Sequence, residues 1–375
     1  MDIDIFFQLS KKDLNNVVFF DLRNIFPELK LDESNQPFSQ EKLPTKPLSF
    51  NSISEFSKYL KNESIVIING FGDQKIKTWR LSFILSKNKI PVISIHNKSG
   101  LLGALGSISK TVEDISSPID KYIKKFLFVI YLLMLKTGLQ SKYDTYFVSG
   151  RVPSSNITKY GTKFNEIIEI HNRTYDEFIK FGPGDGEGEY IVFLDVAMPF
   201  ILDFIEWGIE PLDADDYYNK LNIFFDKLEK IIGKEIVICA HPQFSQDYKN
   251  KYFPNKRVVW FQTNEFITNA SLVIVHFTNA LQYALLHKKK ILLLDDDSFN
   301  PYIREAINFC VKNIGIKKIN YSSISEKNLA HILKNLQVDN NKYDEFINDY
   351  LKKQDEINSS EKIILETLEK KYHIT

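Results

Sequence analysis

Two polar clusters, each directly after an apolar run of strand type, hold the residues best suited to binding a ligand. One is His241-Pro242-Gln243 after the run 237–240, and the other is His276-Phe277-Thr278-Asn279 after the run 272–275. In an open α/β sheet, the carboxyl ends of neighbouring strands form the crevice in which ligands bind. We therefore expect both clusters to line one site.

The first cluster could hold a phosphate group. Proline fixes its own φ and restricts the residue before it, so Pro242 should keep His241 extended and aim its imidazole at a ligand. An imidazole can donate a hydrogen bond to a phosphate oxygen and, when protonated, neutralise its charge. The alternative is a histidine satisfied by the protein itself, with Pro242 only ending the strand. The dipeptide alone favours that alternative.

The second cluster adds an anion-binding pattern. Thr278 and Asn279 are good N-cap residues for a helix that begins near Ala280. A helix N-terminus presents free N–H groups and the positive end of a dipole to an anion. A purely capping role for Thr278 and Asn279 is the alternative, but capping and phosphate binding are compatible.

The elements that would position these residues alternate between strand and helix patterns. Runs of strand type are 17–20, 64–70, 91–96, 145–150, 166–171, 190–195, 237–240, 258–260, 272–275 and 291–294. Helical patterns are 75–87, 113–138, 215–232, 280–286 and most of 326–371. This alternation predicts an α/β fold with parallel, doubly wound sheets.

The chain has one clear break in composition. Residues 181–189 contain four glycines and a proline, which predicts a linker at 182–189. A phosphate-cradling loop is disfavoured there, because three acids would repel phosphate and no apolar strand directly precedes them. We expect a Rossmann-like domain at 1–181, a second at 190–325 facing it across a central cleft, and a helical segment at 326–375 packing across both.

Composition excludes several classes of protein. Lys and Arg number 48 and Asp and Glu also 48, so no global field attracts nucleic acid. Two cysteines cannot build a disulfide framework or a cysteine-based zinc site. The acidic start, Met1-Asp2-Ile3-Asp4, disfavours a signal peptide, and we expect a cytoplasmic protein. The apolar run 126–135 is shorter than the ~20 residues that span a bilayer, and predicts a buried helix.

The run 190–294 resembles bacterial GT-B glycosyltransferases of the sialyltransferase-like and Kdo-transferase-like group. These enzymes assemble capsules, O-antigens and lipooligosaccharides from CMP-activated acidic sugars. The resemblance implies that His241 and Pro242, with Gln243 beside them, contact the CMP part of the donor. In that group a Ser/Thr pair at a later helix start binds the donor phosphate. Here the position reads Phe277-Thr278-Asn279, so only Thr278 keeps a hydroxyl; we place it with His276 and Asn279 in the donor site.

The catalytic acid is open between several candidates. Inverting members of the group use an aspartate of the N-terminal domain beside a glycine as the base, which Asp73 and Asp185 match locally. Retaining Kdo-type members use an aspartate near the first strand of the C-terminal domain as nucleophile, which implies Asp195. His171 and Asp176 form a further polar cluster after a strand. A carboxylate can serve either mechanism, and a solvated or helix-capping role is the alternative for each acid.

The expected function is transfer of an acidic sugar, Kdo or a nonulosonic acid, from a CMP-activated donor to a hydroxyl of a surface-glycan or glycolipid acceptor. The alternatives are a UDP- or GDP-sugar donor, a related epimerase of the same two-domain architecture, and a non-catalytic nucleotide- or sugar-binding protein on the same fold. Residues 295–297, three aspartates, predict a solvated turn, and we expect no required metal or cofactor. No nucleic acid is expected as a partner, whereas peripheral association with the inner face of a membrane is compatible with a lipid-linked acceptor.

Overall fold

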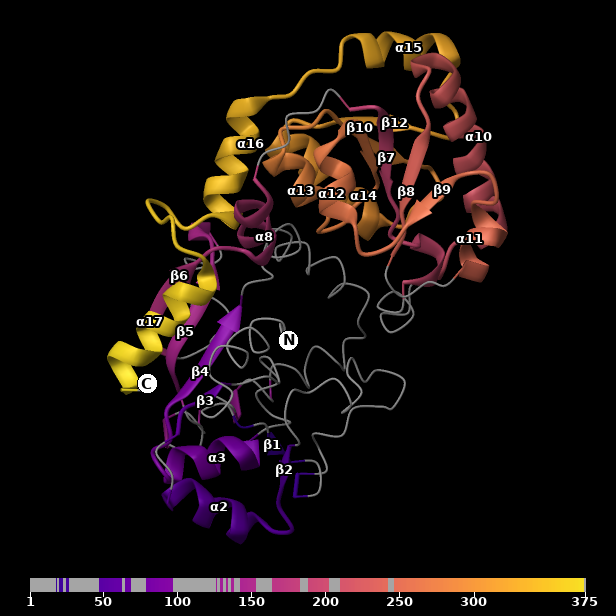
Figure 1. Ribbon diagram of the computed structural model, residues 1–375. Coiled ribbons are helices and arrows are strands. Elements are labelled where there is room, and N and C mark those ends of the chain that lie inside the picture. The colour runs from indigo at the N-terminus through magenta and orange to yellow at the C-terminus, as the bar shows by residue number, and fades with distance from the viewer. Residues whose placement is uncertain are drawn as a thin grey trace. The chain divides into compact units, whose positions relative to one another are not determined.

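The computed structural model of the chain (Figure 1) describes residues 18, 20–22, 25–26, 47–62, 65–68, 79–96, 126, 129–130, 133, 136–137, 142–152, 164–182, 188–201, 210–241 and 246–373. These residues form two compact units. The first, here unit 1, holds the described residues up to 96, those from 126 to 172 and those from Lys353 onward. The second, unit 2, holds the described residues of Arg173–Lys352.

Unit 1 is an α/β unit around a parallel sheet of order β3-β4-β5-β6, with a separate parallel pair β1-β2. Its elements are β1 (Phe20–Asp21), β2 (Leu48–Ser49), α2 (Ile53–Asn62), β3 (Ile67–Ile68), α3 (Trp79–Lys87), β4 (Val92–His96), β5 (Tyr143–Ser149), β6 (Phe164–Ile170) and α17 (Ser360–Tyr372).

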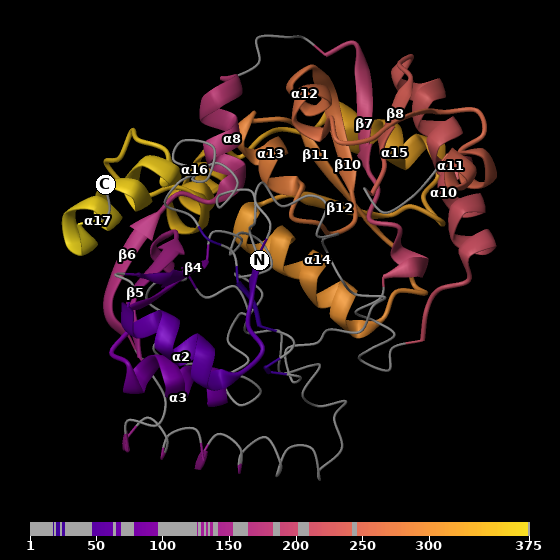
Figure 2. The same ribbon diagram turned by 60° about the horizontal axis from the view of Figure 1, so that its bottom comes forward.

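Both faces of the unit 1 sheet are covered by helices. Successive side chains of a strand point to opposite faces, so neighbouring residues of β4 pack in different cores. Val92 of β4 packs in a core with α2 and α3, which lie side by side (Figures 1 and 2). The next residue, Ile93, packs in another core with Ile363 and Ile364 of α17. The last helix of the chain therefore completes the core of unit 1.

Unit 2 is a second α/β unit with one six-stranded parallel sheet. Its elements are α8 (Arg173–Phe181), β7 (Tyr190–Leu194), η6 (Met198–Phe200), α10 (Ala214–Ile232), β8 (Ile236–Cys239), α11 (Gln246–Tyr252), β9 (Arg257–Val259), α12 (Thr263–Thr268), β10 (Ala270–Val275), α13 (Leu281–Leu286), β11 (Ile291–Asp295), α14 (Pro301–Ile314), β12 (Lys317–Asn320), α15 (Glu326–Lys334), α16 (Asn340–Phe346) and η7 (Ile347–Leu351).

The strand order of unit 2 is β12-β11-β10-β7-β8-β9. The chain runs outward from β7 through β8 to β9, returns to the other side of β7 at β10, and runs outward again. The order therefore reverses between β7 and β10, which is the topological switch point of a doubly wound sheet. Helices α10 and α11 lie on one side of the strands and α12 and α13 on the other (Figure 2).

Sequence periodicity explains these elements well in unit 2. The strands β7, β8 and β10 are almost wholly apolar, as strands buried on both faces must be. Helix α10 starts at the N-cap Asp213, whose carboxylate accepts from Asp216 N, and ends at Gly233 with φ 73°. The expected parallel, doubly wound α/β architecture is confirmed.

The boundary between the units does not coincide with the predicted linker. Helix α8 precedes residues 182–189 yet belongs to unit 2, where Tyr283 of α13 donates a hydrogen bond to Glu177 and Phe178 packs edge-on against His287. The chain leaves unit 1 after Asn172 and returns to it at Lys353. Residues 183–187 of the predicted linker lie outside the described residues. Among the residues that are described, no helix is long and apolar enough to cross a membrane.

Candidate functional site

The register of unit 2 brings two of the candidate residues together at the switch point. Leu194 of β7 pairs with Val275 of β10, so Asp195 and His276 follow on neighbouring strands at the same carboxyl edge. On the other side of β7, Leu194 pairs with Cys239 of β8, two residues before His241. Three of the residues singled out from the sequence therefore end adjacent strands.

His276 is fully buried, and both of its ring nitrogens bind protein groups. Nδ1 donates to the carbonyl oxygen of Leu294 at 2.9 Å, because a carbonyl can only accept. Nε2 consequently accepts from the hydroxyl of Tyr217 at 2.8 Å. Burial lowers the pKa of His276 to about 4, so the ring is neutral at pH 7. This geometry makes His276 a residue that holds strand ends in place.

Asp195 is buried, but its carboxylate is hydrogen-bonded rather than isolated. Oδ1 accepts from Ala197 N at 2.8 Å and Oδ2 accepts from the hydroxyl of Tyr248 at 2.5 Å. Burial raises its pKa, and the bonds from Tyr248 and Ala197 partly offset that rise, leaving the pKa at about 6. A carboxyl group with this pKa is mostly ionised at pH 7 and close to the range suited to a general base.

The backbone after Asp195 is strained. Ala197 adopts the left-handed conformation with φ 49° and ψ 50°. A residue with a Cβ pays of order 1 kcal/mol for this conformation. The bond from Ala197 N to Asp195 holds the turn, which leads directly into η6. Strained turns of this kind cluster at functional sites, which supports a functional site at the switch point.

Tyrosines connect Asp195 to the segment that carries His241. Tyr248 lies on α11, the helix that follows residues 242–245. Because Tyr248 donates to Asp195, the hydroxyl of Tyr218 must be the donor in its own short bond to Tyr248. The end of β7, the start of α11 and helix α10 are thus joined in one buried polar chain. Sequence reasoning missed these tyrosines, since their three- and four-residue spacing on helices is typical of core positions.

His241 differs from His276 because it is only half buried. It follows β8 and Ala240, whose N–H donates to Val259 O at 3.0 Å. Burial lowers its pKa, which favours the neutral form of the imidazole. It can therefore offer a hydrogen bond to a phosphate rather than a full positive charge. Pro242 and Gln243, predicted to act with it, lie outside the described residues.

Thr278 and Asn279 precede α13, which begins one residue later than expected. Thr278 Oγ1 accepts from Ala280 N at 3.3 Å, and Asn279 Oδ1 accepts from the amide of Gln282 at 3.4 Å. The N-cap residue itself is Ala280, without a side-chain bond. Neither Thr278 nor Asn279 is therefore the N-cap residue that the sequence predicted, although both side chains make local hydrogen bonds next to the start of α13. Their part in phosphate binding stays a prediction.

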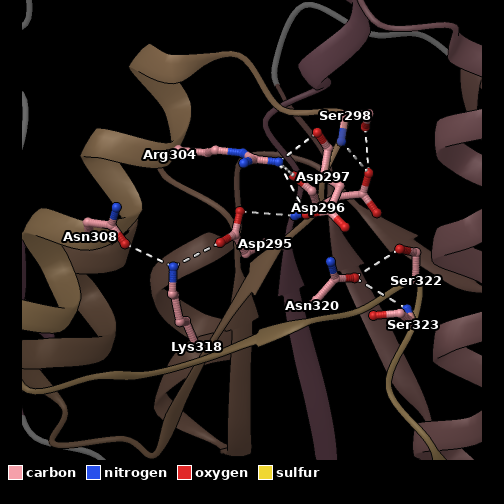
Figure 3. Close-up of polar contacts among 10 residues, drawn as sticks. All are labelled: Asp295, Asp296, Asp297, Ser298, Arg304, Asn308, Lys318, Asn320, Ser322 and Ser323. Carbon is pink, nitrogen blue, oxygen red and sulfur yellow. Dashed lines mark hydrogen bonds and ion pairs between the residues drawn. The ribbon is translucent and has the colours of Figure 1, made fainter.

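The three aspartates at the end of β11 do point to different partners, but they are not all solvated (Figure 3). Asp295 Oδ2 pairs with Lys318 at 3.0 Å, and exposed Asp297 pairs with Arg304 at 3.3 Å. Asp296 is buried, and its Oδ1 accepts from the N–H and hydroxyl of Ser298 at 2.9 and 2.6 Å. Burial raises the pKa of Asp296, but hydrogen bonds, including those from Ser298, lower it below the usual range.

The prediction of a wholly solvated turn is therefore wrong for Asp296. A continuation of β12 lies beside this turn: Asn320 Oδ1 accepts from Ser322 Oγ at 2.9 Å and Ser323 N at 3.2 Å (Figure 3). Asn320 itself pairs in register with Asp295.

Within the described ranges, no group of three or more His, Cys, Asp or Glu side chains is placed to hold a metal ion.

The other candidate catalytic residues, one histidine and three aspartates, do not lie at this edge of the sheet as far as the structure describes them. His171 belongs to unit 1, is buried, and accepts the N–H of Lys353 on Nδ1 at 2.9 Å while its carbonyl accepts from Ser360. It therefore fastens the C-terminal segment where the chain re-enters unit 1. Asp176 lies in the first turn of α8, in unit 2, where an acid complements the helix dipole. Asp73 and Asp185 lie outside the described residues.

Comparisons with known proteins identify a fold. No family model and no curated protein matches this sequence. The wall teichoic acid polymerase TagF superposes on 99% of this chain and 85% of its own, with a TM-score of 0.50 and 13% identity. Lower similarities include UDP-GlcNAc 2-epimerase of Methanocaldococcus jannaschii (84% and 78% covered, TM-score 0.40, 14% identity) and spinosyn forosaminyltransferase SpnP (86% and 80%, 0.40, 11%).

At these identities the similarity concerns the fold alone. Two Rossmann-like α/β units with parallel sheets, as in TagF, form the fold type of the GT-B glycosyltransferases. The fold class expected from the sequence is therefore confirmed. The resemblance to the sialyltransferase-like and Kdo-transferase-like group in particular stays a prediction.

Proposed function

We propose that this protein is a glycosyltransferase that binds a nucleotide-activated sugar at the carboxyl edge of the unit 2 sheet. One observation carries the proposal: the strand order reverses between β7 and β10, and the strands around this point end in Asp195, His241 and His276. In open α/β sheets, ligands bind at such switch points. The fold shared with TagF, a wall teichoic acid polymerase, supports the same class of chemistry.

The residues take different roles in this proposal. His241, half buried and with its neutral form favoured, donates a hydrogen bond to a donor phosphate oxygen. Thr278 and Asn279 lie at the next loop along the edge, where the Thr278 hydroxyl can also bond an anion. His276 and Tyr217 act as positioning residues, because their polar atoms are already bonded to one another and to Leu294.

Asp195 is the described acid best placed to act on the sugar. Its carboxylate keeps one lone pair free on each oxygen, and its pKa of about 6 leaves it ionised at pH 7. It could act as a general base toward an acceptor hydroxyl or as a nucleophile. Because only 5% of the residue is exposed, either role requires the groups around it to open toward the substrate.

For the donor we propose a CMP-activated acidic sugar, Kdo or a nonulosonic acid, with a surface glycan or glycolipid as acceptor. The order His241-Pro242 and then Thr278, each after a strand, supports this donor through the resemblance described above. A UDP- or GDP-sugar would use the same strand ends and differ only in how the base is bound. The reaction as proposed uses no cofactor or metal besides the donor.

Thermal unfolding with CMP, UDP or GDP at millimolar concentration tests the proposal. A nucleotide present at ~100 times its dissociation constant stabilises the folded protein by about 2.7 kcal/mol, which raises Tm by about 5–10 °C. A shift with CMP alone supports the acidic-sugar donor, and a shift with UDP or GDP alone replaces it by the alternative. The absence of a shift with all three contradicts a nucleotide site.

Two histidine variants make the test specific to the site. His241→Ala should reduce the nucleotide-induced rise in Tm by more than half, because it removes the imidazole that donates a hydrogen bond to the phosphate. His331→Ala, on the exposed surface of α15, is the matched control and should leave the shift unchanged. Equal shifts in both variants would place the nucleotide elsewhere.

A further inference from the structure

The hydroxyl of Tyr248 is the one side-chain donor that the described residues provide to the Asp195 carboxylate. It donates to Oδ2 at 2.5 Å, while Oδ1 accepts from the backbone N–H of Ala197. A buried carboxylate loses its hydration, and each hydrogen bond that it accepts offsets part of that loss. Tyr248 therefore acts directly on the charge and the orientation of Asp195.

Tyr218 fixes the direction in which the Tyr248 hydroxyl points. A carboxylate can only accept, so the hydrogen of Tyr248 goes to Asp195 and its oxygen accepts the hydrogen of Tyr218. Both phenols are neutral at pH 7, because burial raises the pKa of each well above its usual value. A hydroxyl that itself accepts a hydrogen bond is a stronger donor, so the two tyrosines act on Asp195 as one unit.

Aromatic packing holds the two tyrosine rings independently of their hydroxyls. The rings of Tyr218 and Tyr248 meet edge to face, with centroids 5.7 Å apart. Phe200 of η6 packs on both rings, at 6.5 and 6.3 Å between centroids. Phe253 does the same at 5.3 and 6.0 Å. Removal of one hydroxyl should therefore leave the rings in place and take away only its hydrogen bond.

The titratable groups that adjoin Asp195 on α10, α11 and the two neighbouring strands are uncharged at pH 7. They are three phenols, a buried thiol and a buried imidazole: Tyr217, Tyr218, Tyr248, Cys239 and His276. Burial raises the pKa of the phenols and of the thiol, and lowers that of the imidazole. Hydrogen bonds, rather than an ion pair, therefore offset the burial of Asp195.

We propose that Tyr248, held by Tyr218, is the positioning residue of Asp195: its hydroxyl orients the carboxylate and stabilises its negative charge for the step on the sugar. This inference rests on the proposed function, because it takes Asp195 as the base or nucleophile. Either role requires a charged carboxylate, since a protonated one can neither take up a proton nor attack a carbon atom. Without the Tyr248 hydroxyl, the buried carboxyl group would keep its proton to higher pH.

Carboxyl NMR of the full chain tests the proposal without a substrate. The protein carries ¹³C at the aspartate Cγ atoms, and the spectrum of Asp195→Asn identifies the resonance of Asp195. In Tyr248→Phe the pKa read from this resonance should rise by about one pH unit, because the lost bond favoured the charged form. Tyr218→Phe should raise it by less than half as much, because Tyr248 still donates to Asp195.

Tyr252→Phe is the matched control. Its ring packs on that of Tyr218 with centroids 4.2 Å apart, but the two bonds that Asp195 accepts come from Ala197 and Tyr248. The pKa of Asp195 should therefore stay at its wild-type value. If Tyr248→Phe does not fold, Tyr218→Phe decides the question, since a rise above this control supports the proposal and no rise contradicts it.

The pH dependence of kcat/KM gives the second readout. The reaction followed is release of CMP from CMP-N-acetylneuraminic acid, or of the nucleotide from UDP-N-acetylglucosamine or GDP-mannose where UDP or GDP raises Tm instead. In Tyr248→Phe the acidic limb of the profile should move to higher pH by the same amount as the NMR pKa. On the plateau above it, kcat should stay roughly three- to ten-fold below the wild type, because the carboxylate is charged but less well oriented, while KM changes little.

The outcomes separate this inference from the proposed function. An unchanged pKa of Asp195 in Tyr248→Phe, or an equal rise in Tyr252→Phe, overturns the role of Tyr248 even if the wild type releases nucleotide. A raised pKa with an unmoved pH profile overturns it as well, because the acting group is then not Asp195. If the wild type releases no nucleotide and no nucleotide raises its Tm, the proposed function fails and the role in the sugar step fails with it, although a raised pKa still establishes the action of Tyr248 on Asp195.

Discussion

At the residue scale, Asp195 and His276 titrate in the same pH range with opposite effects on stability. Folding raises the pKa of Asp195 from 3.8 to about 6, so the folded state holds that proton to higher pH and the free energy of unfolding falls as pH rises through this range. Folding lowers the pKa of His276 from 6.5 to about 4, so its contribution rises with pH over nearly the same range. In the wild type the two contributions largely cancel.

Asp195→Asn should reveal this cancellation. The variant lacks the Asp195 carboxyl group, whose contribution to the free energy of unfolding falls as pH rises. The free energy of unfolding of the variant relative to the wild type should therefore rise by about 2 kcal/mol between pH 4.5 and pH 7, because folding raises the pKa of Asp195 from 3.8 to about 6. The measurement is the difference in Tm between variant and wild type at both pH values, expected to change by several degrees. A difference in Tm that is the same at both pH values would contradict the raised pKa of Asp195.

The sequence placed Asp195 and His276 at strand ends but could not show that they are buried. Their burial depends on Tyr217 from α10 and Tyr248 from α11, which lie more than 20 residues away along the chain. A histidine with both nitrogens bonded internally and a half-buried histidine look alike in a sequence. The structure shows that His276 is fully buried and that His241 is half buried.

At the scale of elements, one glycine of the predicted linker is required by packing. Gly188 lies just before β7, and a Cβ there would come within 2.1 Å of Ser271 N and 2.2 Å of Asn269 O. These backbone atoms belong to the entry of β10 and cannot move without disturbing the pairing of β7 with β10. The composition suggested flexibility at this position, whereas the structure shows a close approach of two backbones.

Gly188→Ala should therefore destabilise unit 2 strongly. Because backbone atoms must shift at the central strand pair, we expect a loss of at least 3 kcal/mol, the size of other severe steric mechanisms. Gly233→Ala is the matched control: its φ of 73° strains an alanine, but a Cβ there meets nothing within 4 Å, so the loss should be about 1 kcal/mol. Tm values of both variants, measured side by side, check the order. Equal losses would mean that the backbones at Gly188 can move apart with little loss of free energy of unfolding.

The elements themselves followed from local patterns where the signal was strong. The pattern over 215–232 predicted α10 to within one residue, and the apolar strands around it were also predicted, whereas its N-cap at Asp213 and its end at Gly233 were identified in the structure. Helix α8 was not predicted, because the pattern of Arg173–Phe181 is short and follows a strand directly. Its membership in unit 2 depends on the contact with α13, which no local pattern contains.

At the scale of the whole molecule, unit 1 is built from discontinuous parts of the chain. Helix α17 completes its core through Ile363, Ile364 and Leu368. Lys371 of the same helix pairs with Glu166 of β6 at 2.8 Å. The last helix should consequently protect the unit 1 sheet and have no direct effect on the sheet of unit 2.

Ile364→Ala tests this arrangement. The side chain is fully buried, and its truncation should cost about 2–5 kcal/mol by leaving a cavity. Amide hydrogen exchange should accelerate in β4, β5 and β6 and stay unchanged in β7, β8 and β10. Ile357→Ala, at an exposed position, should change neither set. Acceleration in both sheets to the same extent would show that the two units unfold as one.

The sequence by itself determined the fold class, the unit 2 strands β7 to β11 but not β12, and the strand ends that carry Asp195, His241 and His276, because periodicity and turn residues are local properties. Only the tertiary structure decided which of these side chains is accessible, which unit α8 and α17 join, and that Phe126, Val129 and Leu133 face solvent. The physical reason is that burial and pairing depend on contacts between residues far apart in the chain. The prediction that the run 126–135 forms a buried helix is wrong for Phe126, Val129 and Leu133, which are exposed. An apolar run looks the same in a sequence whether its side chains pack in a protein core or face solvent.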